Sequence, residues 1–230
     1  MIALFVNGIG VKRVAATKTR DRILKAALGL FNERGETHVS IAQIAAKIGI
    51  SEGNLWYHFR TKHDLVAALF AELEERIERN LTRKPASAGA DLADFGEYAR
   101  QSFRDIWDYR FLYRHRFDPE AEGELAQRIA ALIQRAQRQT ERILAEMVAR
   151  KLFAASPQEI SALAVNAWII WRYWLDYLQE RHGLARITEA ELQAGVKQLF
   201  ALYHPYLTDA ARAQIAAAHE PAAPKKAARG

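Results

Sequence analysis

The sequence contains no cysteine, and this absence excludes several kinds of functional site. Without thiols the chain forms no disulfide, has no thiolate nucleophile, and offers no thiolate ligands to a zinc ion or an iron–sulfur cluster. The common catalytic motifs are absent too: there is no H-E-x-x-H, no G-x-S-x-G, no P-loop and no dinucleotide fingerprint. We therefore predict that the protein is not an enzyme, has no catalytic residues, and needs neither a metal ion nor another cofactor.

Long hydrophobic runs and helix-breaking residues are scarce as well. No apolar segment approaches the roughly 20 residues that a membrane-spanning helix requires, and the opening MIALFVNGIG lacks the basic start of a secretory signal. Only 12 glycines and 6 prolines interrupt 230 residues, and apolar residues recur at helical spacing almost throughout. The sequence predicts a soluble, cytoplasmic, all-α protein without membrane contact.

Positive charge is concentrated at one end of the chain. The net charge is +6; residues 1–64 carry 10 Lys/Arg against 5 Asp/Glu, whereas the remainder carries 23 against 22. A basic segment on a nearly neutral body is typical of a protein that binds a polyanion at one end, and nucleic acid is the commonest candidate. A solvated basic face without a partner is the alternative interpretation of the charge alone.

Capping signals divide the first third of the chain into four predicted helices. A serine or threonine followed three residues later by Gln, Asp or Glu indicates a helix start, and glycine indicates a helix end. In chain order the signals are Gly35, Ser40 with Gln43, Gly49, Ser51, and Thr61 with Asp64. They predict a helix ending near residue 35, two short helices, and a long fourth helix over about residues 62–83. Residues 1–16 show no clear periodicity, and we expect a flexible leader there.

The rest of the chain predicts a helical body. Ser156-Pro157 and the Thr188/Glu191 pair are further capping signals. Helices are expected over about residues 91–108, 119–151, 157–182 and 188–204, with a short one from Thr208. A loop is expected over 84–90, and the tail over 219–230, with its Ala, Pro and Lys, is expected to be disordered.

The turn Gly49-Ile50-Ser51 between two short helices fits a helix-turn-helix, in which the following helix enters the DNA major groove. Residues 23–66, ILKAALGLFNERGETHVSIAQIAAKIGISEGNLWYHFRTKHDLV, resemble the signature of the TetR (tetracycline-repressor) family of transcriptional regulators. That signature is a helix ending in F-x-x-x-G, followed by T-I-x-x-I-A-x-x-A-G-V-S-x-G-x-L-Y-x-H-F-x-x-K-x-x-L. The resemblance implies an N-terminal helix-turn-helix DNA-binding domain over 17–64, joined by the long fourth helix to a helical effector-binding and dimerisation domain over 65–218.

The predicted third helix carries the strongest candidates for DNA contact. Gly53 would let the helix approach DNA closely, and Asn54 can pair with adenine or contact phosphate. Trp56, Tyr57 and His58 are consecutive rings that cannot all be buried on one face. The resemblance places Tyr57 and His58 against phosphate, whereas Trp56 departs from the commoner tyrosine and either contacts a thymine methyl or packs.

Other candidates flank that helix. The resemblance assigns Lys62, at the start of the fourth helix, a phosphate contact aided by the helix N-terminus. Further predicted DNA contacts are Lys18, Arg20, Thr37, Ser40, Gln43 and Ser51. For Lys18 and Arg20 a solvated arm is an equal alternative, and for Ser40 the capping role competes.

The body is the variable part of such proteins, and the resemblance implies a small-molecule pocket inside it and a homodimer formed through about residues 157–204. That region is rich in aromatic rings, for which core packing is the favoured interpretation and the dimer seam or a pocket wall the alternatives. The predicted ligand contacts are Phe103, Arg104, Trp107, Tyr113, Trp168, Trp171 and Arg172. The composition of residues 104–117 would suit an anionic or aromatic effector, although Asp105, Asp108 or Asp118 could instead pair with the arginines, and such a structural salt-bridge network is the favoured interpretation.

We predict a ligand-responsive repressor that binds a palindromic operator as a homodimer and releases it when an effector moves the fourth helix. A dimeric regulator without small-molecule sensing, or an activator, is the alternative.

Overall fold

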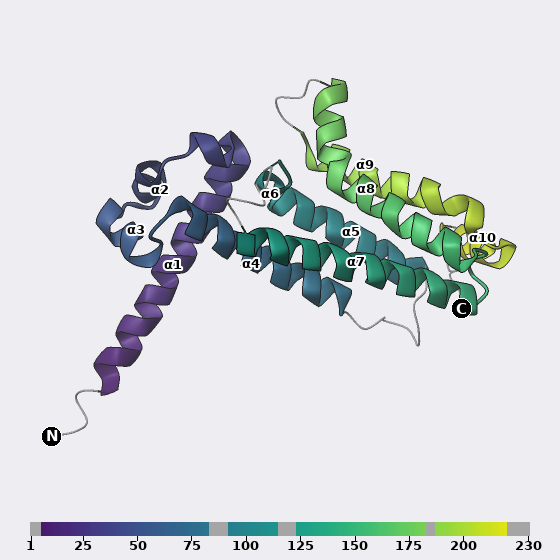
Figure 1. The fold of residues 1–230 in the computed structure, drawn as a ribbon, viewed down its shortest axis with the longest axis horizontal. Helices are drawn as coiled ribbons and strands as arrows, with labels where there is room; N and C mark the ends of the chain where they lie inside the picture. Colours follow the sequence, from purple (N-terminus) through teal and green to yellow (C-terminus); the bar gives the residue numbers. More distant parts are fainter. Residues whose placement is uncertain (1–5, 83–91, 115–122, 183–186, 220–230) are drawn as a thin grey trace, which may run out of the picture.

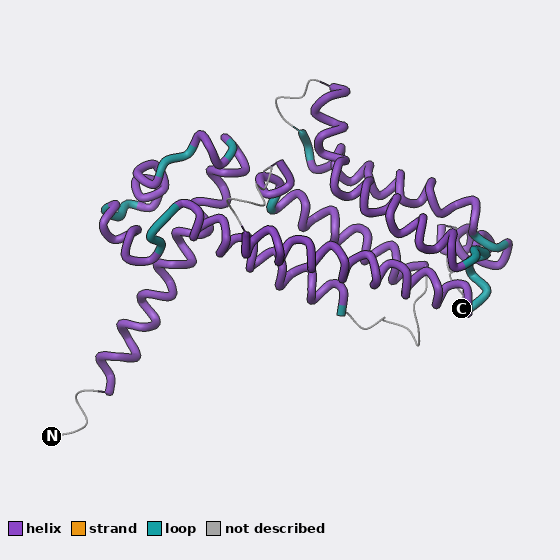
Figure 2. Tube along the Cα trace, viewed as in Figure 1, coloured by secondary structure: helices purple, strands orange, loops and turns teal. Residues whose placement is uncertain are grey.

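A computed structural model describes residues 6–82, 92–114, 123–182 and 187–219 of the chain. Within these ranges the protein is helical and contains no strand, as the sequence predicts (Figure 2). No described helix is long and apolar enough to cross a membrane. The elements are α1 (Val6–Arg34), η1 (a 3₁₀ helix, Glu36–His38), α2 (Ile41–Ile48), α3 (Glu52–His58), α4 (Lys62–Leu81), α5 (Leu92–Asp108), α6 (Arg110–Arg114), α7 (Gly123–Ala149), α8 (Pro157–His182), α9 (Glu189–Tyr203), η2 (His204–Tyr206) and α10 (Asp209–His219).

The helices form an elongated molecule with two parts (Figure 1). α1, α2 and α3 gather at one end, and α5, α7, α8 and α9 form a bundle at the other. α4 begins beside the first three helices and continues into the body, where it packs against α5 and α7. The predicted arrangement, a helix-turn-helix joined by a long fourth helix to a helical body, is confirmed.

Local capping explains where the short helices begin and end. The Ser40 hydroxyl accepts from the Gln43 backbone N–H (3.2 Å), and the Gln43 side chain accepts from the Ser40 N–H (2.9 Å), which completes the predicted capping box. Gly35 and Gly49 adopt φ values of 83° and 69°, a left-handed region that glycine enters without strain. α2 and α3 are therefore held in place by sequence signals that act over a few residues.

Part of the segment 1–16, where a flexible leader is expected, is helical, while the flexibility of this segment stays a prediction. α1 already begins at Val6, so residues 6–16 are helical. Apolar periodicity reports the burial of one face rather than helicity itself, and this stretch holds no proline. The expected loop over 84–90 and the tail from residue 220 lie outside the described residues.

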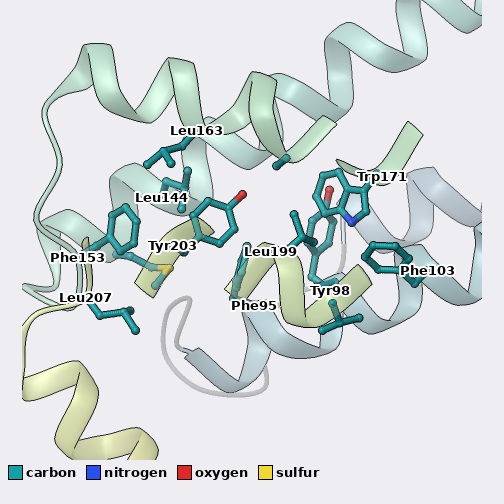
Figure 3. Close-up of a cluster of buried hydrophobic side chains, with 14 of the residues drawn as sticks. Phe95, Tyr98, Phe103, Leu144, Phe153, Leu163, Trp171, Leu199, Tyr203 and Leu207 are labelled. Carbon is teal, nitrogen blue, oxygen red and sulfur yellow. The ribbon is translucent and has the colours of Figure 1, made fainter. Parts of the chain in front are cut away.

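Two hydrophobic cores stabilise the two parts. One lies among α1–α4 and includes Ile23, Phe31, Ile44 and Leu55; it continues into the body through residues of α6 and α7. The other lies within the bundle, where aromatic rings from α5, α8 and α9 meet (Figure 3). Because the first core extends into the body, the two parts are packed together rather than linked only by α4.

Gly195 lets α9 approach α5 and α8 closely. A Cβ at this position would lie 2.4 Å from the Phe103 ring and 2.9 Å from the Trp174 ring. Phe103, one of the predicted ligand contacts, is fully buried. Phe103 therefore packs between α5 and α9 in the core of the bundle.

Candidate nucleic-acid interface and internal cavity

α3 presents an exposed aromatic face. Tyr57 and Trp56 are 81% and 44% exposed, whereas Leu55 and the following Phe59 are buried at 0% and 4%. The buried pair fixes α3 against the core of the first part. Trp56 and Tyr57 lie on the outer surface of the helix-turn-helix, where a binding partner can contact them.

The predicted DNA contacts lie in the same part of the molecule. Exposed members of the set are Lys18, Arg20, Thr37, Ser40, Gln43, Ser51, Gly53, Asn54, Trp56 and Tyr57, and the half-buried members are His58 and Lys62. Several have intramolecular roles as well: Ser51 caps α3 by accepting from the Asn54 N–H (3.2 Å), and the Arg20 guanidinium lies 5.3 Å from the Phe59 ring centroid. Their contacts with DNA stay predictions.

The Lys62 ammonium has three oxygen partners inside the protein. It lies 3.0 Å from a carboxylate oxygen of Glu36, and it donates to the carbonyl oxygens of Glu36 (3.0 Å) and Val39 (3.4 Å). These contacts attach the start of α4 to the segment between α1 and α2. A DNA phosphate at Lys62 would have to share or replace the Glu36 carboxylate.

The body contains an apolar cavity of about 100 Å³ between α4, α6, α7 and α8. α6 contributes Leu112 and Tyr113, and α8 contributes Trp168 and Arg172. The other lining residues are Phe70, Leu73 and Ile77 of α4, and Ile129, Leu132, Ile133 and Ala136 of α7. Arg172 is the one charged residue in this lining.

The structure divides the predicted ligand contacts into two groups. Tyr113, Trp168 and Arg172 line the cavity. The other four, Phe103, Arg104, Trp107 and Trp171, do not. Trp171 is buried in the bundle core, where its ring packs against Tyr98 at 5.7 Å between centroids. Arg104 pairs with Glu97 at 2.6 Å.

Sequence reasoning missed the apolar lining residues of α4 and α7. Their spacing is that of any buried helix face, so nothing in the pattern separates a cavity wall from a filled core. The polar lining residues were found because charged or polar-tipped side chains amid apolar ones are unusual.

Arg172 and Tyr113 form the polar end of the cavity. Arg172 donates from Nη1 to the backbone carbonyl of Tyr113 (2.7 Å), and the same nitrogen lies 3.7 Å from the half-exposed carboxylate of Asp176. Burial raises the pKa of the Tyr113 phenol well above its ordinary value, and Asp105 adds to this effect while Arg172 opposes it. The phenol therefore keeps its proton at neutral pH.

Asn32 of α1 joins the part formed by α1–α3 to the body. Its side-chain amide donates to the carbonyl of Asp108 (2.7 Å) and accepts from the N–H of Phe111 (3.1 Å). Beside this pair of hydrogen bonds, the rings of Phe31 and Phe111 lie 5.2 Å apart. One short helix, α6, thus contacts α1 through Phe111 and lines the cavity through Leu112 and Tyr113.

A second set of contacts joins α4 to the end of α5. Arg76 donates to Asp108 (2.8 Å) and lies 3.4 Å from Asp105, and the Tyr109 hydroxyl donates to Glu72 (3.2 Å). Asp105 is almost fully buried, and this burial raises the pKa of its carboxyl although Arg76 opposes the shift. Two of the three aspartates considered as partners for the pocket arginine are thus paired with Arg76, and Asp118 lies outside the described residues.

An apolar stripe runs along the outside of α8. Val165, Ile169, Tyr173 and Tyr177 succeed one another every four residues and are each 41–53% exposed. Large apolar side chains that remain exposed as a contiguous stripe are typical of an interaction surface.

Comparison with known proteins identifies the family. Residues 23–69 match the family described as bacterial regulatory proteins, tetR family, and residues 71–215 match the one described as bacterial transcriptional repressor. The chain belongs to the TetR family. It is therefore a member of a family of DNA-binding transcriptional regulators, as its helix-turn-helix predicts.

Several TetR-family proteins resemble this chain individually. It is 34% identical over 100 residues to the transcriptional repressor NicS of Pseudomonas putida, a match that spans 44% of this chain and 45% of NicS, less than half of that relative. A transcriptional repressor of Mycobacterium tuberculosis is 30% identical over 179 residues, which is 78% of this chain and 85% of the relative. A TetR-family regulator of Marinobacter aquaeolei superimposes with a TM-score of 0.77 and 32% identity, over 87% of this chain and 96% of that one.

Proposed function

We propose that this TetR-family protein is a cytoplasmic repressor that binds a palindromic operator as a homodimer and responds to a small-molecule effector in the cavity. The observation that carries the DNA-binding part is the exposed face of α3, with Tyr57 and Trp56 outward and Leu55 inward. A helix presented in this way fits the major groove, and the basic first quarter of the chain supplies the phosphate attraction.

The α8 stripe supports the homodimer. A second copy placed across Ile169 and Tyr173 would cover the exposed apolar side chains, and a two-fold axis would bring each residue against the same surface of its partner. Two α3 helices related by this axis would read the two halves of a palindrome.

The dimer is tested with Ile169→Glu, which places a charge in the stripe. We expect this variant to sediment as a monomer and to lose most of its operator affinity. The control is Ala130→Glu, the same charge change at an exposed position of α7, which should leave a dimer. A dimeric Ile169→Glu variant would contradict this interface.

The cavity and the helices around it support effector response. α4 carries cavity residues and also packs against α1, while α6 carries cavity residues and is bonded to Asn32. A ligand that displaces either helix would change the position of α1–α3 relative to the body. A structural neighbour at 18% identity, SmeT, was solved as a triclosan complex, so this fold accommodates a small molecule.

The proposal as a whole is tested by selecting bound sequences from a random DNA pool with the full-length protein. We expect a palindromic consensus whose half-sites lie about one helical turn, or somewhat more, apart. Recovery of sequences with no common element would contradict sequence-specific operator binding.

A further inference from the structure

The residues that line the cavity between α4, α6, α7 and α8 limit the chemical class of ligand that it can bind. Apolar side chains form most of its wall, and no acidic residue belongs to its described lining. The only charge in this lining comes from the Arg172 guanidinium. A cation beside mostly apolar side chains is costly to desolvate unless an acceptor or an anion meets it.

The existing contacts of Arg172 leave room for such a group. Within the described part of the chain, its hydrogen bond to Tyr113 and its approach to Asp176 both use Nη1, and its guanidinium also lies over the Tyr173 ring, 5.0 Å from the ring centroid. The pairing with Asp176 is a 3.7 Å contact between neighbouring turns of α8, with a carboxylate that is 41% exposed, so water competes for it. A planar guanidinium can present its remaining N–H groups to a second, planar anion.

The size of the cavity limits the ligand to a small molecule. Its volume is about 100 Å³, whereas an engineered apolar cavity of about 150 Å³ binds benzene and typical drug sites occupy about 300–1,000 Å³. A single ring is therefore the largest group that fits with modest movement of the walls.

The spacing on α8 sets the place of the charged group. Trp168 and Arg172 both line the cavity and are four residues apart, so they stand on one face of α8, separated by about 6 Å along its axis. A ring that packs on Trp168 would bring a substituent attached directly to that ring within reach of Arg172.

We propose that the cavity binds small aromatic carboxylates, with the ring between Trp168 and the α4 wall and the carboxylate on Arg172. This inference rests on the proposed effector role of the cavity and specifies its ligand class. It makes Arg172 the residue that selects anions over neutral and cationic molecules of the same shape.

The test is isothermal titration calorimetry on the full-length dimer with benzoate, benzyl alcohol and benzylamine, which share a ring and differ in charge. We expect benzoate to bind at least tenfold more tightly than benzyl alcohol, and benzylamine to bind most weakly. Equal affinities, or tighter binding of benzylamine, would overturn the proposal.

Variants separate an anion-binding role of Arg172 from a structural one. Arg172→Gln should lose at least tenfold in benzoate affinity while its benzyl alcohol affinity stays within about threefold, and Arg172→Lys should keep part of the preference for benzoate. The control Arg142→Gln removes the same charge from an exposed position on α7 and should change neither affinity. Equal losses for benzoate and benzyl alcohol in Arg172→Gln would show that Arg172 only supports α6.

A further variant tests whether the probes bind in this cavity. Ala136→Phe places a ring in the cavity and should abolish binding of all three probes; unchanged benzoate binding would place the site elsewhere and overturn the proposal. Calorimetry needs no DNA, so a protein that binds its operator but none of these probes contradicts this inference alone, whereas loss of operator recognition contradicts the proposed function.

Discussion

Replacing Asn32 by alanine removes the pair of hydrogen bonds that joins α1 to the α5–α6 corner. The variant loses both bonds, worth about 1 kcal/mol each, and leaves the N–H of the buried Phe111 without its acceptor, at a cost of about 1–3 kcal/mol. Because position 32 is only half-buried, water can enter there, bond to the unpaired groups and offset part of this loss of stability. We expect the free energy of unfolding to fall by about 2–3 kcal/mol, a large share of the about 5–15 kcal/mol typical of proteins.

Urea unfolding at one fixed protein concentration measures this loss, and amide hydrogen exchange at Phe111 locates it. The control is Asn80→Ala, which also removes two side-chain hydrogen bonds, to Tyr98 and Ser102, but both partners lie in the body. Asn80→Ala should destabilise the protein without accelerating exchange at Phe111. Wild-type stability and wild-type exchange at Phe111 in Asn32→Ala would refute the assigned coupling between α1 and α6.

Three further outcomes are expected. Gly49→Ala should lower the free energy of unfolding by about 1 kcal/mol, because the backbone φ at this position is +69°. Gly29→Ala should raise the free energy of unfolding by about 0.5–1 kcal/mol, because Gly29 lies inside α1 with open space around it, and thermal melts compare the two variants. Burial raises the pKa of Tyr98 from 10.0 to about 12, so the folded state holds the phenol proton more tightly than the unfolded state does. The free energy of unfolding should therefore fall as the pH rises from about 10 to about 12, and urea titrations should show a smaller fall in Tyr98→Phe. Glu36→Gln should strengthen DNA binding severalfold at low salt, because it removes the carboxylate that competes with phosphate for Lys62; gel-shift titration would contradict this if the affinity fell.

The helix boundaries could be predicted where the signal is local. The Ser40/Gln43 box, the Ser51 cap and the left-handed Gly49 act within a few residues, and the structure shows each of them. The start of α1 could not be predicted in this way, because helicity over residues 6–16 leaves no apolar stripe in the sequence.

The cavity was only partly predictable for a different reason. Arg172 and Trp168 stood out by residue type, but the direction of each side chain depends on how α5 and α8 rotate against their neighbours. Phe103 of α5 packs against Gly195 of α9, a contact between distant residues that sequence patterns cannot pair, whereas Arg104 pairs with Glu97 two turns earlier on the same helix. The apolar wall of α4 and α7 has the spacing of ordinary core.

DNA reading by α3 is tested by fluorescence anisotropy of the protein on DNA from just upstream of its own gene, over a salt series, with Tyr57→Ala as the variant and Arg142→Gln as the control. We expect saturable, sequence-preferring binding that weakens steeply with salt. Binding should be reduced in Tyr57→Ala, because Tyr57 is the most exposed large hydrophobic side chain of α3, and it should be preserved in the control. Absence of DNA binding even at low salt, or equal binding by Tyr57→Ala, would contradict the assignment of α3 as the DNA-reading surface.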